Sequence, residues 1–333
     1  MPDVPAVELE QVSKEFARGV RAVDGVSLAV PAGQVVALLG PSGCGKTTTL
    51  RLINRLEEPS GGAIRVRGRE VHDLPPETLR RSIGYVIQEG GLFPHWDVSA
   101  NVATVPRLLG WPRERIGRRV TEVLDLVGLP ENVFGRRMPA ELSGGQRQRV
   151  GVARALAGDP DLLLMDEPFG ALDPGTREAL QDEFLRLQAR LRKTVILVTH
   201  DIAETGKLAD AVVLMDHGRV LQQGSLREIL LHPVNARAGA FLGTQGQGLA
   251  LEALRLRHLL GELTPVPAAA AAVHLESQAK LGQVLVALLK LPDDAVVTIS
   301  ETNSSAFSAK QLRDLVLRDL RTLAPANGRS SHD

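Results

Sequence analysis

The sequence predicts an α/β fold followed by a small α+β unit. Short apolar runs alternate with amphipathic stretches up to about residue 230 and end in polar or glycine-bearing turns, which is typical of a parallel sheet covered by helices. Beyond a Gly- and Gln-rich segment, this alternation gives way to a shorter helix–strand–helix pattern. We therefore expect one domain over residues 1–242, a linker at 243–248, a second domain at 249–325 and a disordered tail at 326–333.

The strands of the first domain are expected in two sets. Continuous apolar runs predict buried strands of a parallel sheet at 35–39, 162–165 and 195–198. Shorter segments predict antiparallel strands at 7–16, 27–30 and 63–66. Between these sets the sequence predicts a helical subdomain over about 92–160, with helices at 115–127 and 145–157.

The carboxyl-terminal segment predicts two helices around one strand. Leu281, Val284, Leu285 and Leu288 follow helical spacing, and residues 295–299 are strand-like. The run from Ser308 to Gln311 is a capping-box pattern, in which Gln311 would bond back to the start of a second helix.

Composition limits the classes of function. Lys plus Arg and Asp plus Glu both number 39, so the net charge of zero argues against a nucleic-acid partner. Hydrophobic residues make up 44% of the chain, which is enough for a sizeable core. The single cysteine, Cys44, excludes an internal disulfide and fits a reducing compartment. Because no secretory signal or apolar run of ~18 residues is visible, we expect a soluble, cytoplasmic chain.

A phosphate-binding motif follows the first buried strand. Residues 40–47 match G-x-x-x-x-G-K-[ST], between a strand and an amphipathic helix that starts at Thr47. Backbone N–H groups of such a loop surround phosphate oxygens, Lys46 would reach the β- and γ-phosphates, and the Thr47 hydroxyl would bind Mg²⁺. The expected contacts to a nucleotide are Gly40, Pro41, Ser42, Gly43, Cys44, Gly45, Lys46, Thr47 and Thr48.

Cys44 lies at the start of the helix that follows this loop. We expect Cys44 to be a small residue that the loop tolerates, and not a redox sensor. A helix N-terminus can lower the pKa of a thiol, which leaves open a reaction of Cys44 with thiol reagents.

Two acidic residues follow the buried run at 162–165. Asp166 would lie at the carboxyl end of that strand, facing the phosphate loop, where a second Mg²⁺ ligand belongs. Glu167 would point elsewhere and act as the general base on the attacking water.

The run Leu142-Ser143-Gly144-Gly145-Gln146 makes the sequence resemble the ATP-binding cassette (ABC) ATPases. Further motifs of that family occur in order over about residues 7–242. The resemblance implies adenine stacking on Phe16, a Q-loop at Gln88 that serves catalysis and Mg²⁺, a D-loop ending at Asp173 and a catalytic switch histidine at His200.

The family resemblance also implies a fold and an assembly. The fold is a P-loop NTPase with a RecA-like core, an antiparallel β subdomain and a helical subdomain. The assembly is a head-to-tail dimer, either a homodimer or a pair with a second ATPase subunit. It sandwiches two ATP molecules with Mg²⁺ between Lys46 of one chain and the signature residues of the other, Ser143, Gly144, Gly145 and Gln146.

Residues 91–95 and 103–111 closely resemble the ATPase subunits of quaternary-amine osmoprotectant importers, although Glu89-Gly90 departs from that pattern. The resemblance implies transmembrane permease subunits bound in a groove of the helical subdomain, a periplasmic or extracellular substrate-binding protein and a peripheral location on the cytoplasmic face of the plasma membrane. Import of another small solute, such as an amino acid or polyamine, stays an alternative. A non-transport ABC ATPase is a further one.

The tail resembles a single, divergent CBS module, of which osmoprotectant ATPases often carry a pair. It lacks the usual Gly and Asp pattern after residue 299, and about 85 residues are too few for a pair. A regulatory unit and a passive dimer-stabilising appendage both remain open.

Overall fold

The computed structural model describes residues 4–87, 91–170, 172–242, 246–266, 273–300 and 305–323. The chain forms two compact units. The first comprises Met1–His200 and Leu208–Leu221, and the second comprises Asp201–Lys207 and Gln222–Asp333. The predicted boundary at residue 242 differs from this division, because α9 (Ile202–Leu208) and residues 222–242 pack with the tail. Such packing between distant segments leaves no trace in local composition.

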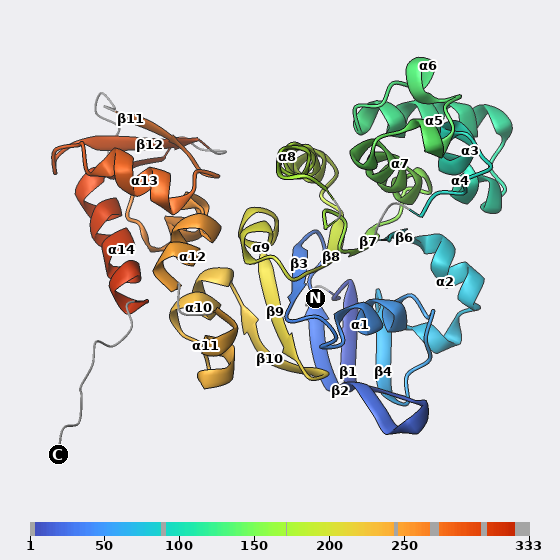
Figure 1. Ribbon diagram of the computed structural model, residues 1–333, viewed down its shortest axis with the longest axis horizontal. Coiled ribbons are helices and arrows are strands. Elements are labelled where there is room, and N and C mark those ends of the chain that lie inside the picture. Colours follow the sequence, from blue (N-terminus) through green and yellow to red (C-terminus); the bar gives the residue numbers. More distant parts are fainter. Residues whose placement is uncertain are drawn as a thin grey trace. The chain divides into compact units, whose positions relative to one another are not determined.

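A six-stranded sheet forms the centre of the first unit. Its strands are labelled in Figure 1. Parallel pairing joins β9, β3, β8, β7 and β6 in that order, and β10 lies beside β9. Every residue of β3 and β8 is buried, which confirms the prediction from continuous apolar runs. The strands are β3 (Val35–Leu39), β6 (Ile83–Val86), β7 (Leu162–Asp166), β8 (Thr194–Thr199), β9 (Ala211–Asp216) and β10 (Arg219–Gly224).

A second, antiparallel sheet confirms the other set of predicted strands. Its order is β2-β1-β4-β5, and β1 pairs antiparallel with both β2 and β4. The second strand begins at Val20, seven residues before the predicted start, because its outer half is exposed and lacks an apolar run. The bounds are β1 (Val7–Phe16), β2 (Val20–Val30), β4 (Gly61–Val66) and β5 (Arg69–Glu70).

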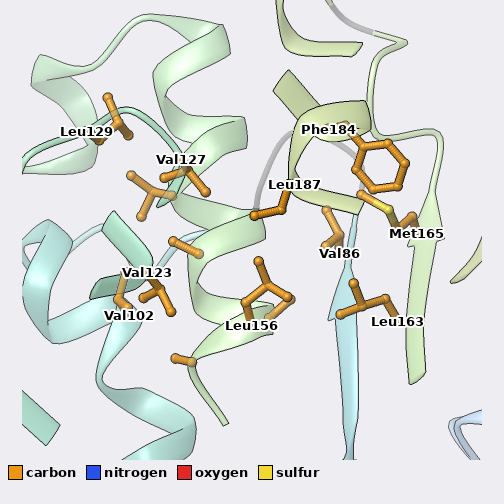
Figure 2. Close-up of a cluster of buried hydrophobic side chains, with 14 of the residues drawn as sticks. Val86, Val102, Val123, Val127, Leu129, Leu156, Leu163, Met165, Phe184 and Leu187 are labelled. Carbon is orange, nitrogen blue, oxygen red and sulfur yellow. The ribbon is translucent and has the colours of Figure 1, made fainter. Parts of the chain in front are cut away.

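Helices fill the predicted insertion and pack on the sheet. Side chains of β6 and β7 meet those of the insertion and of α8 in one buried cluster (Figure 2). In that cluster Val86, Leu163 and Met165 come from the strands, while Val123 and Phe184 come from helices. The helices of the unit are α1 (Lys46–Ile53), α2 (Pro76–Ser82), α3 (Val98–Val102), α4 (Thr104–Leu108), α5 (Arg113–Leu126), α6 (Glu131–Phe134), α7 (Gly144–Ala157) and α8 (Pro174–Leu191).

The second unit contains a small mixed sheet. Strand β11 pairs parallel with β12, and β12 pairs antiparallel with β13. Helix α12 begins at Gly246, inside the segment predicted to be a linker, while residues 243–245 lie outside the described residues. The elements are α10 (Leu226–Leu231), α11 (Ala236–Leu242), α12 (Gly246–Ala253), the 3-10 helix η4 (Leu256–Glu262), β11 (Val273–Glu276), α13 (Leu281–Leu288), β12 (Val296–Ser300), β13 (Ser305–Ser308) and α14 (Ala309–Thr322).

The predicted capping box at Ser308 is wrong, although α14 does begin at the next residue. The Ser308 hydroxyl donates to the carbonyl of Asp293 at 3.5 Å and does not cap the helix. The Gln311 amide, oriented to satisfy both of its polar atoms, bonds with the backbone of Thr264 at 3.0 and 3.2 Å. A tertiary contact has replaced the local one.

None of the helices in the described segments is both long enough and apolar enough to span a bilayer.

Candidate active site

The phosphate loop connects β3 to α1 and depends on two glycines. A Cβ on Gly40 would lie 2.2 Å from the carbonyl oxygen of Met215, and one on Gly45 would lie 2.3 Å from that of Ala22. Gly45 also has a φ of +106°, in the region that favours glycine. The loop can therefore approach neighbouring backbone closely and leave Pro41, Ser42 and Gly43 exposed at its outer side, while Thr48 is half-buried on α1.

The ammonium group of Lys46 lies over the loop. Lys46 is 5% exposed, and its Nζ donates to the carbonyl oxygens of Gly40 at 2.7 Å and Pro41 at 2.9 Å. A buried cation held by carbonyl dipoles attracts an anion at the start of α1, where the helix dipole acts in the same direction.

A hydroxyl and a carboxylate form the neighbouring oxygen site. The Thr47 hydroxyl donates to Asp166 Oδ1 at 2.8 Å, which brings together two residues that are 119 positions apart in the chain. Burial raises the pKa of Asp166, and a bound cation would offset that cost. Hard oxygen donors beside a phosphate site are the ligands that Mg²⁺ prefers, so this pair fits that ion. When bound, Mg²⁺ would neutralise charge on the β- and γ-phosphates.

Two further residues, which the sequence analysis did not single out, interact with Asp166. The charge of Arg51 lies close enough to lower the pKa of Asp166, against the larger effect of burial. Burial, and then the charge of Asp166, raise the pKa of Tyr85. The parallel pairing of β6 and β7 brings Tyr85 beside Leu164, and that pairing could have suggested this neighbour.

The Glu167 carboxylate lies beside His200, whereas that of Asp166 bonds with Thr47. The φ of Glu167 is +43°, unusual for a residue with a side chain, and its N–H donates to the carbonyl of Val198 on β8 at 3.0 Å. Its Oε1 lies 3.3 Å from Nδ1 of His200, which follows the end of β8. Side-chain exposure is 25% for Glu167 and 57% for His200, so a water molecule can reach this pair.

The signature residues open α7 and contact the start of α8. The Ser143 hydroxyl accepts from the N–H of Gln146 at 3.2 Å, and the Gln146 side chain accepts from the N–H of Ser143 at 2.9 Å. A Cβ on Gly145 would lie 2.6 Å from Cγ2 of Thr176, whose N–H is in turn bonded to the Asp173 carboxylate at 3.0 Å. The motifs at 142–146 and at Asp173 therefore form one packed corner, in which Gly144 lies beside Leu172.

The remaining predicted residues, Phe16, Gln88 and Cys44, differ in where they lie. Phe16 is 38% exposed at the end of β1, with Lys14 Nζ 4.8 Å from its ring centre. Gln88, predicted to serve catalysis and Mg²⁺, lies outside the described residues, as do Glu89 and Gly90. Cys44 is buried, and burial raises the pKa of its thiol, contrary to the activation that a helix N-terminus alone would give.

Known proteins resemble a large part of the chain. The family described as ABC transporter matches residues 23–170. The osmoprotectant import ATP-binding protein OsmV of Salmonella typhimurium is 50% identical over 71% of this chain. The glycine betaine uptake system ATP-binding protein YehX of Escherichia coli K12 is 51% identical over 75% of this chain. The matches span 63% of the length of OsmV and 80% of that of YehX.

Among the solved structures that share the fold, an example at 34% identity is described by its bound ligands. It is a dimeric ATP-binding cassette, MJ0796, in a post-hydrolysis state bound to ADP and Pi. It is 34% identical, with a TM-score of 0.59, and the match covers 66% of this chain and 98% of that one.

Proposed function

Because the chain belongs to the ABC transporter family of ATP-binding proteins, we propose that it hydrolyses ATP to energise an importer of quaternary-amine osmoprotectants such as glycine betaine, choline, carnitine or proline betaine. The observation that carries the ATPase is the convergence of the phosphate loop, the Thr47–Asp166 pair and the Glu167–His200 pair at the carboxyl ends of adjacent parallel strands. The substrate class is supported by the printed names of the relatives.

In this proposal each residue has a distinct part in hydrolysis. Lys46 and the loop amides bind the phosphates, and Thr47 and Asp166 hold Mg²⁺, with Gln88 as a third contact. Glu167 accepts the proton of the attacking water, and His200, bonded to Glu167, orients that carboxylate and contacts the γ-phosphate.

The complete site is proposed to need two chains. Ser143, Gly144, Gly145 and Gln146 present a helix N-terminus that would hold the phosphates of ATP bound to the partner's loop. Asp173, packed against the same corner, would lie at that interface, and Phe16 would stack on adenine. The dimeric state of the similar ABC cassette supports this arrangement.

The partners are proposed to lie in and outside the membrane. The helical subdomain exposes the apolar side chains of Phe93, Trp96, Leu108 and Leu109, which would suit docking of permease subunits. The chain would then be peripheral on the cytoplasmic face, with a separate substrate-binding protein outside. The second unit, with the order β11–α13–β12–β13–α14, is assigned either a regulatory or a dimer-stabilising role.

Uptake by cells tests the substrate class. A strain lacking this chain should lose ATP-dependent uptake of radiolabelled glycine betaine, choline or carnitine and grow poorly at high osmolarity with that compound supplied. Expression of the wild-type chain should restore uptake, and Lys46→Ala, which lacks the phosphate-binding cation, should not. Normal uptake of these amines with loss of another solute, such as an amino acid or polyamine, would contradict the substrate class and leave the importer ATPase standing.

A further inference from the structure

The turn between β9 and β10 lies against the phosphate loop. His217 and Gly218 connect the two strands with φ of +44° and +77°, the conformation that closes a tight two-residue hairpin. Strand β9 pairs parallel with β3, so the turn lies at the end of β3 from which the phosphate loop begins. The turn, the phosphate loop and β2 all belong to the first unit.

Gly218 fixes the orientation of one peptide group in the phosphate loop. The N–H of Gly218 donates to the carbonyl oxygen of Cys44 at 2.9 Å. In a trans peptide the C=O and the following N–H point in opposite directions, so the N–H of Gly45 is directed away from the turn. Backbone N–H groups of this loop are the proposed donors to phosphate. Gly218 therefore orients one of these donors.

Close packing connects the turn, the phosphate loop and β2. A Cβ on Gly218 would lie 3.0 Å from the carbonyl oxygen of Ala22 on β2, and a Cβ on Gly45 would lie 3.5 Å from the Cα of Gly218. Gly218 is buried. Because these backbones are packed without intervening side chains, a displacement of the turn would also displace the loop.

Asp24 on β2 holds the turn from the other side. Its N–H donates to the carbonyl of Gly218 at 2.8 Å. Its Oδ2 accepts from Nε of Arg219 at 2.7 Å and lies 2.6 Å from Nη2 of the same residue. The hydrogen bond from Arg219 is the main cause of the lowered pKa of Asp24, so the carboxylate is charged at neutral pH. Asp24 thus binds the turn through its backbone and its side chain.

We propose that Gly218 and Arg219 are positioning residues for nucleotide binding. Gly218 directs the N–H of Gly45 toward the phosphates, and Arg219 keeps Gly218 in place through Asp24. The inference rests on the proposed ATPase activity, and it assigns to a hairpin more than 170 positions beyond the loop a part in shaping the phosphate site.

The test measures nucleotide affinity and turnover of the full chain separately. Arg219→Gln should raise the Kd for MgADP and the KM for ATP by about threefold, the size of effect expected from an exposed charged pair. The kcat should stay at the wild-type value, because an amide that contacts phosphate equally before and during the reaction affects KM alone. Arg219→Lys should recover part of the affinity by restoring a cation.

Arg21 provides a matched control for Arg219. Its Nη1 donates to Oδ1 of the same Asp24 carboxylate at 3.0 Å, and its side chain is 54% exposed against 69% for Arg219. Arg21 lies on β2 itself, so Arg21→Gln removes a similar bond without releasing the turn. Affinity for MgADP should therefore be wild-type in Arg21→Gln. Equal Kd values in Arg219→Gln and Arg21→Gln would overturn the inference.

A second pair of variants tests Gly218 directly. Gly218→Ala should raise the Kd for MgADP by about tenfold, since the new Cβ would displace the peptide that carries the N–H of Gly45 and weaken a hydrogen bond to a charged group. Gly110 has a similar φ of +70°, and a Cβ there would meet nothing within 4 Å, so Gly110→Ala should bind MgADP like the wild type. Equal affinities in the two alanine variants would contradict the proposal. If Gly218→Ala does not fold, the Arg219→Gln comparison still decides.

Failure of the proposed function would give a different result. A wild-type chain that binds MgADP but does not hydrolyse ATP would contradict the ATPase assignment, and the comparison of Kd values would still decide the inference. A wild-type chain that binds no nucleotide would overturn both.

Discussion

His258 is a buried base in the second unit whose environment favours its neutral form. Burial, together with the charges of Arg257, Arg255 and Arg227, lowers the pKa of His258 to about 3. Its Nδ1 accepts a hydrogen bond from the N–H of Arg255 at 2.9 Å, which requires that this nitrogen carry no proton. Protonation of His258 at Nδ1 would therefore remove the hydrogen bond at the start of η4.

The sign of the resulting pH dependence follows from the two pKa values. Between an unfolded value near ~6.5 and the folded value of about 3, the unfolded chain binds the extra proton, so acidification favours unfolding. The loss should be about 1.4 kcal/mol per pH unit between pH ~6 and the folded value of about 3, and it should end there. His258→Gln keeps an acceptor for the cap but cannot titrate. Urea unfolding at pH 7 and 5 should show a smaller pH effect in this variant; an unchanged pH effect would contradict the assignment.

Cys44 is buried within the phosphate loop, 3% exposed, and burial raises the pKa of its thiol. Both features oppose formation of a reactive thiolate. A thiol reagent at pH 8 should label the folded chain at least about tenfold more slowly than the same chain in denaturant. Equal labelling rates would show that the loop opens freely and that the folded environment does not protect the sulfur.

At the scale of elements, close packing leaves no space for a side chain at Gly206 on helix α9. In Gly206→Ala the new Cβ would meet the carbonyl of Ala253 at 1.9 Å, so α9 or α12 must shift. We expect a loss of about 2 kcal/mol in the free energy of unfolding. In Gly239→Ala on α11, the Cβ lies 3.8 Å from Pro233, an ordinary contact, so this control should be neutral or slightly stabilising. Equal denaturation midpoints for the two variants would contradict the packing argument.

The elements that the sequence predicts well are those whose signal is local. Continuous apolar runs identify β3, β7 and β8, and the glycine spacing identifies the phosphate loop that follows β3. Strand β6, with only four residues and a glycine, gives too short a pattern. The capping pattern at Ser308 fails because Gln311 bonds with Thr264 instead. That contact depends on tertiary packing, which periodicity does not encode.

In the candidate site, too, local sequence signals predict some features, and tertiary contacts determine the others. Glu167 and Asp166 are predicted from their place after a buried run, and the structure brings Asp166 to Thr47 and Glu167 to His200. The association of α9 with the second unit was not foreseen. It depends on Arg257 and Ala253, which meet Gly206 only in the folded chain.

At the scale of the whole molecule, the proposed dimer divides each site between two chains. Ser143→Arg should block the composite site and leave the phosphate loop of the same chain able to bind ATP. Ser143 caps α7, and in the proposal Ser143 makes no contact with the phosphate loop of its own chain. Ser225→Arg removes an equivalent cap from α10 and controls for the loss of a helix cap. Mixed dimers of Ser143→Arg and Lys46→Ala chains should regain at most one working site. Full turnover by Ser143→Arg alone would contradict the division of the site.

The central claim, that a pair of chains hydrolyses ATP with Glu167 as the base, is tested most directly by Glu167→Gln. ATP turnover and the mass of the ATP-bound protein should be measured together. Glu114→Gln is the control, because the exposed carboxylate of Glu114 pairs only with a neighbouring arginine on α5 in the described contacts. The account predicts that Glu167→Gln binds ATP, loses at least about a hundredfold in turnover and accumulates as a dimer. Turnover near the wild-type rate, or an ATP-bound monomer, would contradict it.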